Sequence, residues 1–385
     1  MSGGSLVVIG SGSLARALCH SIAVLVRDPV RVTVVARSEP RSRELCYTAE
    51  TRARLGGGRA GFRAVPNALT DEDDLAAALT AAEPSLVVCC ASRQSPWEGQ
   101  AAPSAWTALL DAAGIAMALP LHTDLAWLAG RALARLPYRP TLVNACYPDA
   151  VNPLLRALGV PVATGVGNVG LLAASLQREL DLPDQSDLRV LGHHLHLHAC
   201  ADAADEAQAW LGGRPLAGVG DLLADQRAAA RPELNAVTGH AAALLVRALL
   251  SGADLRTSLP GPLGLPGGYP VRVRHGGVEL DLPAGLDRER AIARNQRWAR
   301  REGVEVDGGT VAFAAPVRDV LAPHLGRWAG GFTAGETAGV VGRLLRLRDE
   351  LRRHPAPAGH TAVPVAVPVA RPAVRPAAGP AVRTQ

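Results

Sequence analysis

The sequence predicts an α/β protein with a doubly wound parallel sheet, followed by a second, mixed α+β domain. Three observations support this prediction. Short apolar runs alternate with helical patterns through the first 150 residues, the first run leads directly into a glycine-rich turn, and the alternation breaks down beyond residue 150. Strands that alternate with helices form parallel sheets, because each helix crosses back over the sheet to the next strand.

The glycine-rich turn lies near the N-terminus, in the run Ile9-Gly10-Ser11-Gly12-Ser13-Leu14-Ala15. Gly10 suits a tight turn, and Gly12 has no side chain to keep a diphosphate away from the backbone. The free N–H groups of the following helix start, near Ser13 and Leu14, would face the phosphates. The run therefore predicts a Rossmann-type dinucleotide site, with an ordinary strand-to-helix turn as the alternative.

A basic residue follows the second expected strand, at 31–35. In NAD-binding proteins an acid at this point accepts a hydrogen bond from the ribose 2′-hydroxyl. Here Arg37 takes that place, with Ser38 beside it and Arg41 nearby. A guanidinium cannot accept from a hydroxyl, but it pairs well with a phosphate. This pattern indicates NADP rather than NAD, and a solvated strand end is the alternative.

The rest of the first domain, expected over 1–150, continues the alternation. The fourth strand opens at Ala91 into a loop that contains Arg93 and should lie at the carboxyl edge of the sheet, where ligands bind in such folds. The expected strands are 6–9, 31–35, 62–65, 86–90 and 141–144, and the clearest helices are 14–26, 105–116 and 124–136.

The second domain is expected over 151–353. A hairpin is predicted around Gly276-Gly277, because glycines at this point suit the tight turns that join paired strands. From 354 to 385 the chain is rich in Pro, Ala, Val and Arg without a periodic apolar face, which predicts a disordered tail. The other expected elements are helices at 170–180, 232–250, 287–302 and 335–352 and a strand-like segment at 188–198.

Composition narrows the class of protein. The chain has 385 residues and a net charge of +5, of which Arg371, Arg375 and Arg383 in the tail supply three. Aromatic residues make up 3%, so a nucleic-acid partner is not expected. No apolar run long enough to span a membrane and no signal peptide is recognised, which predicts a cytoplasmic protein without a membrane partner. The six cysteines form no C-x-x-C pair, so no disulfide framework is expected.

Several landmarks follow one another in a familiar order. After the glycine turn come Asn144 with Pro148-Asp149, then Gly192-His193-His194, then Thr238-Gly239 at a long helix. In order and spacing the chain resembles the lactate/malate dehydrogenase superfamily over most of residues 5–350. The resemblance implies that His194 is the catalytic histidine, that Asn144 contacts nicotinamide and substrate, and that Thr238 lies near the substrate pocket. We also expect a homo-oligomer.

One motif of that superfamily is altered. Its Leu-Asp-x-x-Arg reads Leu171-Leu172-Ala173-Ala174-Ser175 here. Leu172 replaces the aspartate that orients the histidine, and Ser175 replaces the arginine that binds the substrate carboxylate. No bidentate fork then holds a 2-oxo acid, and apolar surroundings should lower the pKa of His194. This argues against lactate or malate as substrate and favours a carbonyl, imine or dehydroamino acid in a larger or non-standard substrate. The expected partner is a small-molecule or peptide-like substrate. The candidate substrate contacts are Arg93, Ser175 and Thr238.

Other functions stay open at this point. On a strand at 188–198, the side chains of His194, His196 and His198 would share one face, and an H-x-H pair can bind zinc. No further ligand is evident in the sequence, so no metal is expected. Cys146 is interpreted as a packed thiol. The leading hypothesis is an NADP-dependent oxidoreductase. The alternatives are a nucleotide-binding pseudoenzyme or scaffold and a zinc enzyme.

Overall fold

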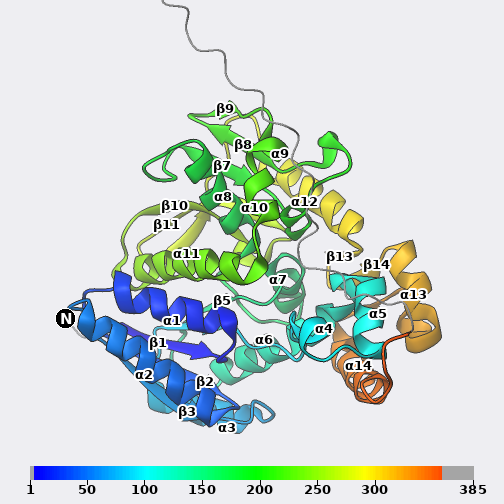
Figure 1. Ribbon diagram of the computed structural model, residues 1–385, viewed down its shortest axis with the longest axis horizontal. Helices are drawn as coiled ribbons and strands as arrows, with labels where there is room; N and C mark the ends of the chain where they lie inside the picture. Colours follow the sequence, from blue (N-terminus) through cyan, green and yellow to red (C-terminus); the bar gives the residue numbers. More distant parts are fainter. Residues whose placement is uncertain (1–3, 358–385) are drawn as a thin grey trace, which may run out of the picture.

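The computed structural model describes residues 4–357, and its centre is a six-stranded parallel sheet (Figure 1). The strand order is β3-β2-β1-β4-β5-β6, and every neighbouring pair is parallel. The order reverses between β1 and β4, which is where doubly wound sheets bind their ligands. The predicted fold class is therefore confirmed. The strands are β1 (Gly4–Ile9), β2 (Val30–Ala36), β3 (Ala60–Pro66), β4 (Leu86–Cys89), β5 (Thr141–Asn144) and β6 (Thr164–Gly165).

Helices cover both faces of this sheet, so its central strands are apolar throughout. Leu6, Val7, Val8 and Ile9 of β1 have no exposed surface, as expected for a strand buried on both faces. The helices between the strands are α1 (Ser13–Leu25), α2 (Glu39–Leu55), α3 (Glu72–Ala82), α4 (Glu98–Ala101), α5 (Ala105–Ala113), α6 (Leu119–Ala134) and α7 (Pro148–Ala157).

The second half of the chain adds three small antiparallel sheets and further helices. The predicted hairpin is confirmed, because β11 and β12 pair around a turn in which His275 and Gly276 both have positive φ angles, of 51° and 75°. The sheets are β7 (Leu188–Leu191), β8 (Gln208–Leu211) and β9 (Arg214–Pro215); β10 (Leu255–Pro260), β11 (Gly268–Arg274) and β12 (Gly277–Leu280); β13 (Val304–Asp307), β14 (Thr310–Phe313) and β15 (Gly331–Thr333). The helices are α8 (Asn168–Glu179), α9 (Val219–Leu222), α10 (Ala224–Ala228), α11 (Arg231–Ser251), α12 (Arg288–Glu302), α13 (Ala315–Leu325) and α14 (Thr337–Leu351).

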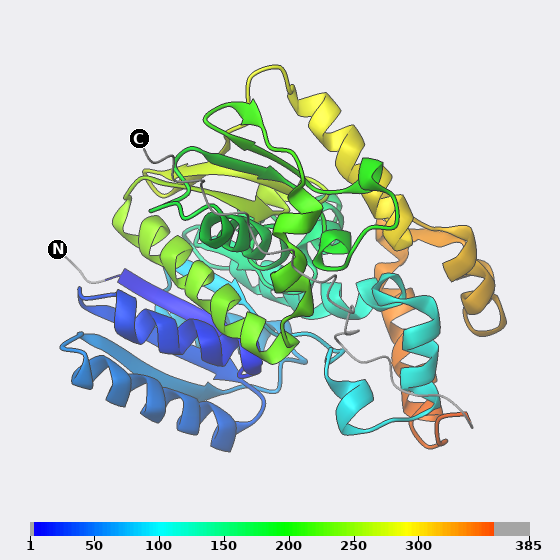
Figure 2. The same ribbon diagram turned by 45° about the horizontal axis from the view of Figure 1, so that its top comes forward.

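Helix α11 lies along α1 and joins the second half of the chain to the first (Figure 2). The two helices approach closely at Gly239, where a Cβ atom would lie 2.4 Å from the Cβ of Ala17. By length and composition α11 could also cross a membrane, as could α5 and α6 together if the 113° bend between them is ignored. The buried face of α11 packs on α1 and on the β10–β11–β12 sheet, as in the core helix of a folded domain.

The C-terminal elements complete the core on one face of the central sheet. Val304, Leu321 and Leu344 belong to the same buried cluster as Val7 and Trp106. The central sheet also extends past the expected domain boundary at residue 150, because β6 supplies its sixth strand. Of the tail expected from residue 354 onward, positions 358–385 lie outside the described residues.

The expected strand at 188–198 is wrong beyond Leu191. The segment turns into a 3₁₀ helix over His194–Leu197 (η2), because local hydrogen bonds compete with strand pairing there. The N–H of His193 donates to Nδ1 of His196 at 2.8 Å, and the His193 ring accepts from the N–H of Leu195 at 3.5 Å. The histidines therefore do not alternate along one strand face.

Candidate functional site

The glycine turn between β1 and α1 forms the first part of the site. Gly10 has a φ of 112°, and a Cβ atom there would lie 3.1 Å from the backbone of Cys90 and Ala91, so the position requires glycine. At Gly12 a Cβ atom would meet nothing within 4 Å. No side chain among residues 4–357 caps α1, so the first N–H groups of this helix lack a side-chain acceptor. The turn therefore has room and hydrogen-bond donors for a diphosphate.

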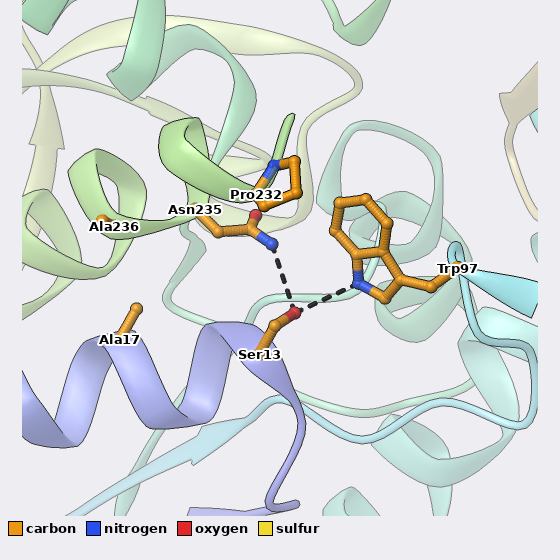
Figure 3. Close-up of a pocket in the computed structure, with 6 residues that line it drawn as sticks. All are labelled: Ser13, Ala17, Trp97, Pro232, Asn235 and Ala236. Carbon is orange, nitrogen blue, oxygen red and sulfur yellow. Dashed lines mark hydrogen bonds between the residues drawn. The ribbon is translucent and has the colours of Figure 1, made fainter. Parts of the chain in front are cut away.

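A cavity of about 350 Å³ adjoins the start of α1 (Figure 3). Ser13, the first residue of the helix, accepts hydrogen bonds at 3.2 Å from Nε1 of Trp97 and from Nδ2 of Asn235. Trp97 comes from the loop after β4, and Asn235 comes from α11. The cavity thus lies where these three elements meet, and its other lining residues are Ala17, Pro232 and Ala236.

Two basic side chains lie at the end of β2 and the start of α2. Arg37 and Arg41 are exposed, and neither has a hydrogen-bond or ion-pair partner within residues 4–357. Ser38 forms the N-cap of α2, but its hydroxyl makes no capping bond. Within the described part of the chain no side-chain partner competes for these groups, so they are available to an anion.

The second part of the site is a group of side chains that we call the His194 cluster: His194, Glu302, Tyr147 and Asp149. Nδ1 of His194 lies 2.5 Å from Oε1 of Glu302, and the Tyr147 hydroxyl donates to Oε2 of Glu302 at 2.6 Å. The N–H of His194 donates to Oδ1 of Asp149 at 3.0 Å, which fixes the backbone of η2. The His194 side chain is 20% exposed and that of Glu302 7%.

The glycine turn and the His194 cluster lie at the same edge of the central sheet. Tyr147 follows β5 directly, and Cys146 before it donates from Sγ to the carbonyl oxygen of Ala91 at 3.3 Å. Ala91 in turn lies against Gly10, at the end of β1. The carboxyl ends of β1, β4 and β5 therefore bring the glycine turn and the His194 cluster to the same place, as predicted for Ala91 and the loop after it.

The charges in the His194 cluster shift each other's ionisation. Burial alone would lower the pKa of His194, but the Glu302 carboxylate, helped by Asp149, outweighs it and raises that pKa above its usual value. Burial would raise the pKa of Glu302, yet His194 and His193 lower it to about 2. Below the raised pKa of His194, and above that of Glu302, the pair is an imidazolium beside a carboxylate.

This arrangement corrects the expectation that His194 lacks a counter-charge and has a lowered pKa. Leu172 is indeed buried and apolar, but the carboxylate comes from Glu302, 108 residues further along the chain. His193 also lies beside this carboxylate, with its Nδ1 3.4 Å from Oε2 of Glu302.

The predicted substrate contacts do not converge on the His194 cluster. Arg93 donates to Asp124 at 2.7 Å and to the Leu69 carbonyl at 3.0 Å, so its guanidinium holds the loop after β4 to its neighbours. Ser175 bonds back to the carbonyl of Leu171 within α8. Thr238 lines a cavity of about 20 Å³ between α8 and α11, which has room for little more than one water molecule.

Asn144 has no exposed surface, and its amide is fully used inside the protein. Its Nδ2 donates to Asn152 at 2.9 Å and to the Cys146 carbonyl at 3.1 Å, while its Oδ1 accepts from the Cys146 N–H. In this conformation Asn144 ties β5 to α7, and a contact with nicotinamide would require these bonds to break. Cys146 is half-buried, and burial raises the pKa of its thiol well above the usual value.

A possible metal site does not present free ligand atoms. Atoms of His196, Cys200 and Glu206 lie within 4.8 Å of one another. However, His196 accepts from the His193 N–H and donates to the Asp205 carbonyl, both at 2.8 Å. Glu206 forms a two-point ion pair with Arg227. A metal ion would have to displace these partners, so the donor set fits a hydrogen-bonded core better than a zinc site.

Sequence reasoning missed Glu302, Tyr147, Asp149 and His122. Tyr147 and Asp149 follow β5, and such positions at the carboxyl edge are a usable signal. Glu302 ends a charged helix, and nothing local distinguishes it from the solvated acids around it. His122 is buried in α6 with Nδ1 2.8 Å from the Ser92 hydroxyl, and burial lowers its pKa to about 4. Its ring lies 6.2 Å from that of Tyr147, at the edge of the cluster.

Known structures share this fold. The malate dehydrogenase from Picrophilus torridus in its apo form aligns with a TM-score of 0.54 at 13% identity, covering 83% of this chain and 99% of that one. The malate dehydrogenase of Cryptosporidium parvum (13% identity, 78% and 98% coverage) and the minor L-lactate dehydrogenase of Enterococcus mundtii (14%, 78% and 96%) each give a TM-score of 0.49.

The first of these alignments supports a relation at the level of fold, and at 13% identity it does not carry an activity or a substrate with it. No protein-family model matches the sequence, and no curated protein matches it. The function must therefore be argued from the site itself.

Proposed function

We propose that the protein is a nicotinamide-dependent oxidoreductase of the dehydrogenase type, with His194 as its proton donor and acceptor. The observation that carries this proposal is the pair of His194 and Glu302 at the same sheet edge as an open glycine turn. The turn, with the N–H groups at the start of α1, would hold the diphosphate of the cofactor. When bound, the nicotinamide supplies or accepts a hydride.

The chain's own contribution is to hold and move a proton. Nδ1 of His194 is engaged by Glu302, which leaves Nε2 as the atom that faces a substrate. Because the pKa of His194 is raised, its ring is protonated over a wider pH range, so Nε2–H can donate to a carbonyl oxygen or imine nitrogen as that group is reduced. Tyr147 and Asp149 keep the carboxylate and the backbone of η2 in place.

The proposed substrate class is the one expected from the sequence: a carbonyl, imine or dehydroamino acid in a larger or non-standard substrate, either a small molecule or peptide-like. Neither Ser175 nor Leu172 offers a polar group to the His194 cluster. Oxaloacetate and pyruvate should therefore be turned over more slowly than about 1 s⁻¹, below the usual enzyme range. Assembly as a homo-oligomer also stays a proposal, to be tested by sedimentation.

The test of the function compares His194→Asn with the wild type. We expect NADPH binding to be retained, since His194 lies outside the glycine turn, and turnover of a panel of carbonyls and imines to fall by about 10²-fold or more. The control is His240→Asn, an exposed histidine on α11 for which both properties should be unchanged. Failure of NADPH to bind the wild type contradicts the proposal. Binding without turnover of any compound favours the nucleotide-binding pseudoenzyme.

We further propose that the cofactor is NADP, on the basis of Arg37 and Arg41 at the end of β2. Arg37→Asp should weaken NADPH binding by about tenfold or more, because it removes a charge-assisted contact to the 2′-phosphate. The same substitution should leave NADH binding nearly unchanged. Reduced-nicotinamide fluorescence measures both affinities.

Arg59→Asp is the matched control for charge. Arg59 is exposed and lies just before β3, at the amino edge of the sheet, away from the ligand edge. If Arg59→Asp and Arg37→Asp weaken NADPH binding equally, the effect is one of net charge. A wild type that prefers NADH would contradict the NADP assignment directly.

A further inference from the structure

Arg231 is a half-buried cation that has no acidic partner among residues 4–357. It is the first residue of α11, and its Nη2 donates to the carbonyl of Leu197 at 3.3 Å and to Nε2 of His198 at 3.1 Å. No carboxylate of residues 4–357 lies within ion-pair distance of it. Arg227, four residues earlier, shows the contrast, because it is fork-paired with Glu206 at 2.7 and 3.0 Å.

An unpaired guanidinium in this setting is costly. Burial lowers the pKa of Arg231, which means that the protein environment disfavours its charged form. The neighbours that it does have, a carbonyl oxygen and a neutral ring nitrogen, do not neutralise its charge. Its Nε and Nη1 donors have no partner among the described residues, so a fork of N–H groups is left for an anion.

The charge of Arg231 acts on the His194 cluster. It opposes Glu302 by lowering the pKa of His194, and together with burial it lowers the pKa of His198 to about 4. The guanidinium lies against the end of η2, because it donates to the carbonyl oxygen of Leu197 at 3.3 Å and to Nε2 of His198 at 3.1 Å. An anion bound to Arg231 would therefore lie beside the segment that begins at His194, the histidine that we propose as proton donor.

The next residue along α11 lines the cavity at the start of α1. Pro232 and Asn235 form one side of this cavity, and Ala17 and Trp97 form others (Figure 3). Its volume of about 350 Å³ is within the range of small-molecule sites. Its walls are mostly apolar. Ser13 accepts from both the Trp97 indole and the Asn235 amide nitrogen, so the Asn235 amide oxygen is the side-chain group among these that is left to orient a ligand.

We propose that Arg231 binds an anionic group of the substrate, and that the apolar part of the same molecule occupies the cavity between Trp97 and α11. The substrate is then an anion, a carboxylate or a phosphate, attached to an apolar portion. This inference rests on the proposed function, since it places the substrate beside His194. It makes Arg231 a specificity-determining residue that neither the glycine turn nor the His194 cluster includes.

The test uses the full-length protein with NADP⁺ bound, so that the ketone probes are not reduced, and three probes of similar size: phenylpyruvate, phenyl phosphate and the uncharged phenylacetone. Calorimetry should show that the wild type prefers one or both anions over phenylacetone. Arg231→Gln should weaken binding of the preferred anion by about tenfold or more, since a charge-assisted fork is lost, and should leave phenylacetone binding unchanged. Whichever anion binds tighter identifies the carboxylate or the phosphate as the group held.

Two controls separate the possible failures. Arg227→Gln removes an arginine of the same segment that already has an acidic partner, and it should not change the preference for anions. NADPH affinity is measured for every variant. If the wild type does not bind NADPH, the proposed function fails. Two results would overturn the assignment of Arg231 while the proposed function stands. Either NADPH binds but the wild type shows no preference for anions, or Arg231→Gln keeps the same preference for anions as the wild type.

Discussion

Replacing Glu302 with glutamine should lower the pKa of His194 to below its usual value and destabilise the protein by about 3–5 kcal/mol. In the wild type the carboxylate outweighs the burial that lowers this pKa. Without the Glu302 carboxylate, burial and Arg231 both lower the pKa of His194, and only Asp149 raises it. Burial is the largest of these three effects. Histidine ring NMR during a pH titration measures the shift, and urea unfolding measures the stability.

The stability loss should depend on pH with a definite sign. The pKa of Glu302 is lowered to about 2, so its stabilising contribution is present above its ordinary pKa near 4.5 and is lost as the pH falls toward 2. The pKa of His194 is raised, so its contribution is present below about 6.5 and is lost as the pH rises through the folded-state value. The difference between wild type and Glu302→Gln should therefore be largest between about pH 4.5 and 6.5.

Glu305→Gln is the matched control, three residues further along the chain. Glu305 pairs with Arg300 at 2.5 Å, but the arginine side chain is 56% exposed. An ion pair at the surface contributes about 0–1 kcal/mol, so this variant should lose little stability and leave the His194 titration unchanged. Equal losses for the two variants, or an unchanged pKa of His194 in Glu302→Gln, would show that the buried pair is not the source of the effect.

Gly239→Ala should destabilise the protein by about 1–3 kcal/mol, although alanine favours helices over glycine. The added Cβ atom would lie 2.4 Å from the Cβ of Ala17 and 2.8 Å from the backbone nitrogen of Leu18. Backbone atoms of α1 cannot move aside singly, so the two helices must separate. Because α1 also carries the glycine turn, NADPH affinity should fall together with the melting temperature.

Gly342→Ala, in contrast, should stabilise the protein. Gly342 lies inside α14, and a Cβ atom there would meet only the mobile end of Arg346, at 3.6 Å. With no clash, the gain in helix propensity of about 0.5–1 kcal/mol should remain. Stabilisation by both alanine variants would mean that the contact between α1 and α11 is looser than the structure indicates.

The central sheet was predictable because its signals are local. Each strand is a short apolar run, and the glycine turn at Gly10 needs only its own neighbours to be recognised. Glu302 was not predictable in the same way, because its partner His194 is 108 residues away and its own helix is rich in charges. The 3₁₀ helix at His194 was missed for a related reason, since side chain-to-backbone bonds among the histidines override the alternating pattern.

Residues that cover one face of the central sheet are made late in translation, because they belong to the C-terminal elements. The sixth strand of the central sheet ends at residue 165, but the residues that cover one face of that sheet include Val304, Leu321 and Leu344. At about 5–20 residues per second, a ribosome needs roughly ten seconds or more to make the intervening segment. Until then the nascent chain has strands without their full apolar cover, so it is during translation that this protein should depend most on chaperones.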